Sequence, residues 1–326
     1  MPNQDQLQQA YPHEAIIYSE GLTKQFNGDT AVEDINLSIA RGKIFGFIGP
    51  SGCGKTTTVR LLTGLYTPTS GMATVLGQNP TQFSQSTQAK IGYMPQLFVL
   101  YDDLSIWQNL NFAASLYGVG LRRKKRLNEL LEFVELHEHQ HKLVRNISGG
   151  MQRRLSLAAT LVHNPDLLFL DEPTTGTDPV LRRKIWDYFR ELQDEGRTLF
   201  ITTQYVNEAA YCDYVGVLTE GRLLMVETPE GLRRKAFGGE VIDLVTTQRI
   251  LYDQLNQIRQ LPYMQGHITR TGETSLRLVV EEAGLAMPVI MKWCNENNLT
   301  VKSIDEYLPP FDDVFVELMN GKAQNE

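Results

Sequence analysis

The sequence has no long hydrophobic run and no excess of positive charge. No apolar stretch approaches the roughly 20 residues that a helix needs to cross a bilayer, so we expect no transmembrane helix. Lys and Arg total 31 against 38 Asp and Glu, which gives a formal net charge of −7. Bulk binding of nucleic acid needs concentrated positive charge, so we also expect no nucleic-acid partner.

Cysteines are few as well, and an N-terminal apolar segment is missing. The three cysteines, Cys53, Cys212 and Cys294, are an odd number and lie far apart. They predict a reducing compartment and no disulfide framework. The first fourteen residues are polar and rich in glutamine, which is not the pattern of a signal peptide. We expect flexible tails at residues 1–14 and 321–326.

What the chain does contain is typical of a globular protein, because apolar residues make up 42% of it. Three short continuous apolar runs, at 43–48, 167–170 and 198–201, predict strands that are buried on both faces. Helical patterns separate these strands. One of these helices begins near Ser148 and another at Asp178, with Pro179 in its first turn. This alternation predicts an α/β fold with a mainly parallel sheet.

The pattern changes after about residue 238. The predicted elements are then, in chain order, strand 240–246, helix 248–259, strand 264–269, strand 275–281, helix 284–297, strand 299–306 and helix 311–318. The βαββαβ order predicts a small ferredoxin-like α+β domain. We therefore expect a large domain over residues 15–237 and an accessory domain over residues 238–320.

A glycine-rich motif links the first buried strand to a helix. Residues 49–56 fit the pattern G-x-x-x-x-G-K-[ST], whose glycines let successive backbone N–H groups surround a phosphate. Lys55 is predicted to neutralise the β- and γ-phosphates of a nucleotide, and Thr56 to ligate Mg²⁺. An ordinary glycine-rich turn does not account for Lys-Thr at this offset. The predicted nucleotide-binding residues of this segment are Gly49, Pro50, Ser51, Gly52, Cys53, Gly54, Lys55, Thr56 and Thr57.

Cys53 lies inside this phosphate loop, at the start of a helix. The positive end of the helix dipole is expected to lower its thiol pKa. We expect alkylation of Cys53 to block nucleotide binding. The alternative is a small residue that only packs, and the two interpretations are compatible.

The second buried strand ends in two carboxylates, Asp171 and Glu172. Asp171 is predicted to lie near the metal. Glu172 is predicted to point toward the water that attacks the γ-phosphate, as a general base must. Alone, the pair would be two solvated acids at a strand end, but beside a phosphate loop it predicts hydrolysis of ATP with Mg²⁺.

A third motif begins the helix near residue 148 and indicates which family of nucleotide-binding proteins the chain resembles. Its residues are Ser148, Gly149, Gly150 and Met151. With this motif the chain resembles the ATP-binding cassette (ABC) family over roughly residues 15–237, with a helical subdomain at about 97–163. The resemblance implies that Ser148 and Gly150 bind the γ-phosphate of ATP held by another subunit. Met151 departs from the Gln that is commonest in this signature.

Further positions match the family. The resemblance implies that Gln96 touches Mg²⁺ or the attacking water and senses a membrane partner. It implies that Asp178 reaches across a dimer and that Phe26 stacks on adenine. The alternative for Phe26 is a core or edge aromatic.

One position departs from the family. Where the family has a histidine, within a run like TTH-x-x-x-E-A, this chain has Gln204. A glutamine amide still donates a hydrogen bond to a γ-phosphate, but it cannot become cationic as histidine does. We therefore expect slow but real ATP hydrolysis, with Glu172, Gln204 and Gln96 as the catalytic residues and with Thr56, Gln96 and Asp171 at the metal.

The resemblance also implies partners. A single cassette must pair with a second one, either another copy or a relative, to complete two composite ATP sites. The implied function is the ATPase subunit of an ABC transporter, docked on separate membrane-spanning subunits at the cytoplasmic face of the inner membrane. Met151, the turn at Gly221 and Arg222, and the segment 308–318 resemble the exporter branch typified by daunorubicin-resistance ATPases. Two alternatives stay open: a soluble ABC ATPase acting on ribosomes or DNA, and a catalytically weak regulatory cassette with an active partner.

Overall fold

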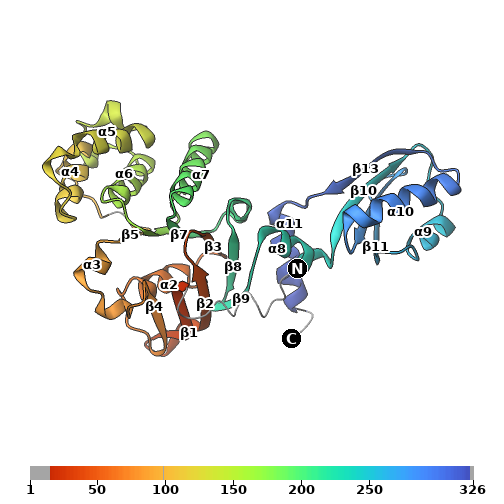
Figure 1. Cartoon of the computed structure of the whole chain (residues 1–326), viewed down its shortest axis with the longest axis horizontal. Coiled ribbons are helices and arrows are strands. Elements are labelled where there is room, and N and C mark those ends of the chain that lie inside the picture. The colour runs from red at the N-terminus through yellow and green to blue at the C-terminus, as the bar shows by residue number, and fades with distance from the viewer. Residues whose placement is uncertain (1–14, 98, 324–326) are drawn as a thin grey trace. The chain divides into compact units, whose positions relative to one another are not determined.

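The computed structural model describes residues 15–323 except residue 98. The tail proposed at 1–14, and the end of the one proposed at 321–326, lie outside the described residues. The chain divides into two compact units, Met1–Val226 and Glu227–Glu326 (Figure 1). Among the described residues, no helix combines the length and the apolar character that a bilayer span requires.

The first unit is built on a six-stranded sheet with the strand order β5-β6-β7-β3-β8-β9. The strands are β3 (Ile44–Ile48), β5 (Ile91–Met94), β6 (Leu167–Asp171), β7 (Thr198–Thr203), β8 (Tyr214–Thr219) and β9 (Arg222–Glu227). The pairs β5–β6, β6–β7, β7–β3 and β3–β8 are parallel, which confirms the predicted mainly parallel sheet. Because parallel strands end at one edge, the segments that follow β3, β6 and β7 emerge close together.

A second, antiparallel sheet and several helices complete this unit. The sheet has the order β2-β1-β4, formed by β1 (Ala15–Phe26), β2 (Asp29–Ala40) and β4 (Ser70–Val75). The helices are α2 (Lys55–Leu62), α3 (Gln85–Gln88), α4 (Ile106–Leu116), α5 (Lys124–Phe133), α6 (Gly149–Leu161) and α7 (Pro179–Asp194). Figure 1 shows α4, α5 and α6 gathered into one helical group.

One residue of this unit lies elsewhere than its helical periodicity predicts. Helical spacing from Val59, Leu61 and Leu62 puts Leu65 on the buried side of the helix after the phosphate loop, but its side chain is 59% exposed. The helix α2 ends at Leu62, and Gly64 adopts a left-handed conformation with φ 77°. A glycine of this kind terminates a helix and turns the chain away from its axis.

The second unit has a four-stranded antiparallel sheet with the order β11-β12-β10-β13. Its elements are α8 (Pro229–Phe237), β10 (Glu240–Thr246), α9 (Tyr252–Ile258), β11 (Met264–Arg270), β12 (Ser275–Val280), α10 (Ala283–Glu296), β13 (Val301–Tyr307) and α11 (Phe311–Ala323). Between α8 and α11 the predicted βαββαβ order is present. Ile242, Leu278 and Ile290 are fully buried in its core. The unit starts at Glu227, ahead of the predicted domain boundary at 237/238.

Candidate functional site

The phosphate loop, residues 49–56, joins β3 to α2, and its backbone depends on glycine. Gly52 and Gly54 have φ values of 82° and 106°, in a region that L side chains rarely adopt. A Cβ atom on Gly54 would lie 2.6 Å from Val32 Cγ1 and 2.7 Å from the carbonyl oxygen of Ala31. The tight turn therefore excludes larger residues and leaves the loop free to surround a phosphate.

Lys55 begins α2 and is held against the loop. Its side chain is 5% exposed, and its Nζ donates hydrogen bonds to the carbonyl oxygens of Gly49, at 2.7 Å, and Pro50, at 2.9 Å. The buried ammonium group is therefore fixed beneath the segment that would receive the phosphates. This arrangement suits a cation that neutralises bound anionic oxygens.

The thiol pKa of Cys53 is shifted in the direction opposite to the prediction. Cys53 is 5% exposed, and its Sγ lies 3.9 Å from Nζ of Lys55. Burial raises the pKa of the thiol, and the nearby charge of Lys55 only partly opposes this. The expectation of a lowered pKa is wrong, because loss of hydration outweighs the ammonium group and the helix start.

Asp171 ends β6 with a fully buried carboxylate. Its Oδ1 accepts a hydrogen bond from the hydroxyl of Thr202, while its Oδ2 is buried without a hydrogen-bond partner in the described part of the chain. Buried polar atoms are normally paired, so Oδ2 indicates a missing partner. Thr56 and Gln96, whose side chains carry oxygen atoms, line a pocket together with Glu172, the residue after Asp171. These hard oxygen donors fit Mg²⁺.

Glu172 follows Asp171 in an unusual backbone conformation. Its φ is 54°, which is uncommon for a residue with a side chain and is a form of strain found at functional sites. Its backbone N–H donates to the carbonyl oxygen of Thr202, at 3.0 Å, and to the Thr202 hydroxyl, at 3.1 Å. The carboxylate Oε2 accepts from the hydroxyl of Thr175 at 3.3 Å. Thr202 therefore holds both carboxylate residues in place.

Sequence reasoning missed Thr202 as a functional residue. The parallel pairing of β6 and β7 sets Asp171 opposite Thr202, a register that no local pattern specifies. The available signal was a hydroxyl at the end of an apolar strand, since such a buried group needs a polar partner.

The structure brings much of the predicted site into one pocket of about 250 Å³. Its lining residues are Ala31, Ser51, Gly52, Gly54, Lys55, Thr56, Thr57, Gln96 and Glu172. Residues of the phosphate loop, the metal-ligand candidates Thr56 and Gln96 and the candidate base Glu172 thus share one cavity, while Asp171, the third metal-ligand candidate, is not among the described lining residues. Gly49 and Pro50 support the cavity through their bonds to Lys55.

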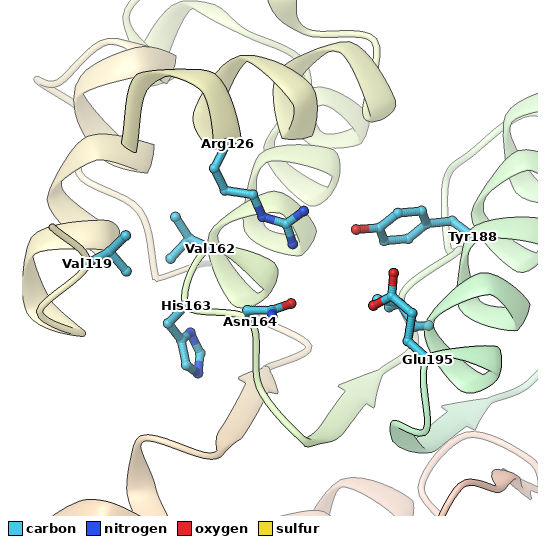
Figure 2. A pocket seen from close by; sticks show the side chains of 8 residues that line it. Val119, Arg126, Val162, His163, Asn164, Tyr188 and Glu195 are labelled. Atoms are coloured by element: carbon cyan, nitrogen blue, oxygen red, sulfur yellow. The ribbon is translucent and has the colours of Figure 1, made fainter. Parts of the chain in front are cut away.

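A larger cavity of about 410 Å³ lies away from the phosphate loop (Figure 2). In it Arg126 and Tyr188 point toward one another across a gap, near Asn164 and Glu195. The guanidinium of Arg126 already donates a hydrogen bond to the carbonyl oxygen of Leu161 at 3.3 Å. The carboxylate of Glu195 would repel a phosphate group. Size alone therefore does not identify the nucleotide site, and the smaller pocket has the matching chemistry.

Gln96 follows β5, and its exposed side chain lines the smaller pocket. Its carbonyl oxygen accepts a hydrogen bond from Nη1 of Arg153, on α6, at 2.9 Å. Arg153 is 5% exposed, and burial lowers its pKa, although the charges of Glu172 and Asp171 oppose the shift. Arg153 ties the segment of Gln96 to the helix that begins at Ser148. Sequence analysis did not single it out.

Gln204 lies directly after β7, at the edge where β3 also ends. Its Oε1 accepts a hydrogen bond from the hydroxyl of Ser51 at 2.9 Å. Because Ser51 lines the pocket, this bond brings Gln204 to the rim of the predicted phosphate site.

The signature residues are arranged separately from the pocket. Ser148 is exposed and caps α6, where its hydroxyl accepts from the N–H of Met151 at 3.3 Å. A Cβ on Gly150 would lie 3.3 Å from the carbonyl oxygen of Gly176, so this helix start adjoins the segment leading to Asp178. The signature residues Ser148, Gly149, Gly150 and Met151 are not among the described residues that line the pocket.

Asp178 and Phe26 are also outside the pocket lining. Asp178 caps α7 by accepting from the N–H groups of Val180 and Leu181, both at 3.0 Å, and these bonds lower its pKa. Phe26 is 39% exposed and makes an edge contact with Tyr66 at 5.3 Å between ring centroids. Its stacking on adenine stays a prediction.

Comparisons with known proteins identify the family of this chain. A family model described as ABC transporter matches residues 32–175. The "Probable multidrug ABC transporter ATP-binding protein YbhF" of Escherichia coli strain K12 is 37% identical over 241 residues. The match covers 74% of this chain and 42% of that protein, so the chain spans less than half of this relative's length.

Two further proteins match over greater shares of their length. The "Daunorubicin resistance ATP-binding protein DrrA3" of Streptomyces coeruleorubidus is 34% identical over 307 residues, 94% of this chain and 96% of that protein. A solved dimeric post-hydrolysis structure of the ATP-binding cassette MJ0796 with ADP and Pi has a TM-score of 0.60 at 25% identity. It covers 65% of this chain and 98% of that one. The chain therefore belongs to the family of ABC transporter ATP-binding proteins.

Proposed function

We propose that this chain binds ATP with Mg²⁺ and hydrolyses it to drive a transporter whose membrane-spanning subunits are separate chains. The observation that carries the proposal is the single pocket in which the phosphate loop, Gln96 and Glu172 meet. The names of two relatives, which refer to multidrug transport and daunorubicin resistance, favour an exporter. Such a subunit would work at the cytoplasmic face of the inner membrane, as a peripheral protein.

The main residues of the site each have a defined task in this proposal. The loop N–H groups and Lys55 bind the β- and γ-phosphates. Mg²⁺, held by Thr56, Asp171 and Gln96, would screen the phosphate charges. Glu172 accepts a proton from the attacking water while the water oxygen approaches the γ-phosphorus.

A second cassette completes the site. The signature residues Ser148 to Met151 do not line their own chain's pocket in the described structure, so they are available to a nucleotide held by another chain. Their helix start offers N–H groups and a positive dipole end to a γ-phosphate. The second cassette is either another copy of this chain or a relative, and similarity to a dimeric cassette supports the pairing.

A purified preparation tests hydrolysis directly. Phosphate release from Mg-ATP should be slow yet clearly above that of a Glu172→Gln variant, which removes the general base. Gln204→His should raise turnover, because an imidazolium stabilises developing charge better than a neutral amide. ATP binding without any turnover above Glu172→Gln would instead favour a regulatory cassette with an active partner, the alternative that Gln204 suggests.

The partner is tested by co-purification of the tagged chain from cells. Recovery of membrane proteins supports the transporter. Recovery of ribosomes or DNA without membrane proteins contradicts it and favours a soluble ABC ATPase.

A further inference from the structure

Two polar side chains that follow the strands β3 and β7 meet at one edge of the sheet. The two strands pair in parallel with Ile48 opposite Thr203, so the residues that follow each strand emerge at one edge. Ser51 and Gln204 meet there, and the Ser51 hydroxyl donates to Gln204 Oε1 at 2.9 Å. This contact joins the phosphate loop to the position where the family normally has histidine.

The direction of this hydrogen bond fixes which end of the amide is free. A glutamine amide carries an acceptor oxygen and a donor nitrogen on the same terminal carbon. Rotation about the last side-chain torsion exchanges their positions. Ser51 occupies the oxygen of Gln204, and no acceptor for Nε2 is found among the described residues. The free amino group is the end that can donate to a phosphate oxygen. The reverse orientation would turn a carbonyl dipole toward an anion.

The backbone on both sides of Gln204 is held, but its side chain is not buried. Thr203 is 1% exposed, and its hydroxyl accepts from the N–H of Tyr205 at 3.0 Å. The Tyr205 ring lies 4.5 Å from the guanidinium carbon of Arg182. Gln204 itself is exposed, and a terminal amide torsion is intrinsically broad. The Ser51 hydroxyl is therefore the contact that selects its orientation.

We propose that Ser51 is a positioning residue that turns the amino group of Gln204 toward the γ-phosphate, so that the pair recognises ATP over ADP without titrating. The inference rests on the proposed function, because it requires ATP in the pocket. A histidine at this position donates from both ring nitrogens when it is cationic, and so needs no such orientation. The pairing thus lets a glutamine act where the family has histidine.

The test measures the affinities of the purified chain for Mg-ATP and Mg-ADP, since only ATP carries a γ-phosphate. Ser51→Ala should weaken ATP binding about 10-fold, because a hydrogen bond to a charged group is lost, and should change ADP binding less than about 2-fold. Ser51→Thr keeps the hydroxyl and should restore most of the preference for ATP. Ser70→Ala, an exposed serine away from the pocket lining, is the matched control.

A double-mutant cycle separates positioning from direct contact with phosphate. In a Gln204→Ala background, Ser51→Ala should cause little further loss of ATP preference, because the amide that it positions is gone. Equal losses in both backgrounds would mean that Ser51 binds the phosphate by itself, which overturns the proposal. If the unmodified chain binds no ATP, the proposed function fails first, so the two failures are distinguishable.

The pH dependence gives a second readout. The ATP-to-ADP affinity ratio of the unmodified chain should stay flat from about pH 6 to 8, since an amide does not titrate there. In Gln204→His the ratio should fall as the pH rises through about 6.5. A fall of the same size in the unmodified chain would contradict recognition by a neutral pair.

Discussion

The pocket and the signature segment of this cassette are in opposite environments. Lys55, Asp171 and Glu172 are 5%, 0% and 6% exposed, and neighbouring strands and loops hold each of them by hydrogen bonds. Ser148 and Asp178 are exposed at helix starts, where each caps its own helix. One half of the proposed ATP site is thus assembled within the chain.

The difference shows how one chain supplies two kinds of site component. A buried component must be held by its own fold or by the ligand that it binds, since unpaired buried polar groups are costly. An exposed component has its backbone groups solvated and can exchange water for a ligand that another chain carries. If this is correct, variants of the two components should fail in different ways.

The largest effect is expected inside the pocket. Lys55→Ala should lower the affinity for Mg-ATP about 100-fold, because the γ- and β-phosphates lose their buried cation. Equilibrium binding with labelled ATP measures the change. Unaltered affinity would show that the pocket does not hold the nucleotide, and circular dichroism checks that the variant is folded.

Ser148→Arg tests the exposed component. It should reduce hydrolysis to the level of Glu172→Gln, because the arginine blocks the approach of the partner's nucleotide. ATP affinity of the dilute single chain should change less than about 3-fold, since Ser148 does not line that chain's pocket. A loss of affinity as large as that of Lys55→Ala would erase the distinction between the two components.

Thr202→Val tests what holds the pocket together. It removes the hydroxyl bonded to Asp171 and to the N–H of Glu172, so it should lower the free energy of unfolding by about 1–3 kcal/mol. Turnover should fall more than ATP affinity, because Glu172 loses its positioning. Urea unfolding measures the stability and steady-state kinetics the turnover, and Thr202→Ser should restore both quantities. Equal stability of the valine variant would contradict this role.

The smallest effect is expected at Asp178. Hydrogen bonds from the N–H groups of α7 lower the pKa of Asp178 in the folded state. The ionised carboxylate therefore stabilises the folded chain at neutral pH, and this contribution is lost as the pH falls through the lowered pKa. Asn caps helices as well as Asp does, so Asp178→Asn should match the parent near acid pH and lose a little stability at pH 7. Thermal unfolding over this range measures the difference. Identical profiles would show that the charge contributes nothing.

The sequence was sufficient for those parts of the fold and site that local patterns determine. The phosphate loop, the buried strands and the caps Ser148 and Asp178 each have a signal within a few residues. The contacts of Thr202 and of Gln204 do not, because each depends on how distant parallel strands align. The pKa of Cys53 was misjudged for a similar reason, since burial comes from the assembled fold and not from the helix start.

The central claim is that a complete ATP site needs components from two chains, and mixing two inactive variants tests it most directly. Lys55→Ala retains an intact signature and Ser148→Arg an intact pocket, so a mixed dimer contains one complete site. The account predicts that neither variant alone hydrolyses ATP and that an equal mixture recovers up to about a quarter of the unmodified turnover. Full hydrolysis by Ser148→Arg alone would contradict the claim, and no recovery in the mixture would contradict a site shared between two copies of this chain.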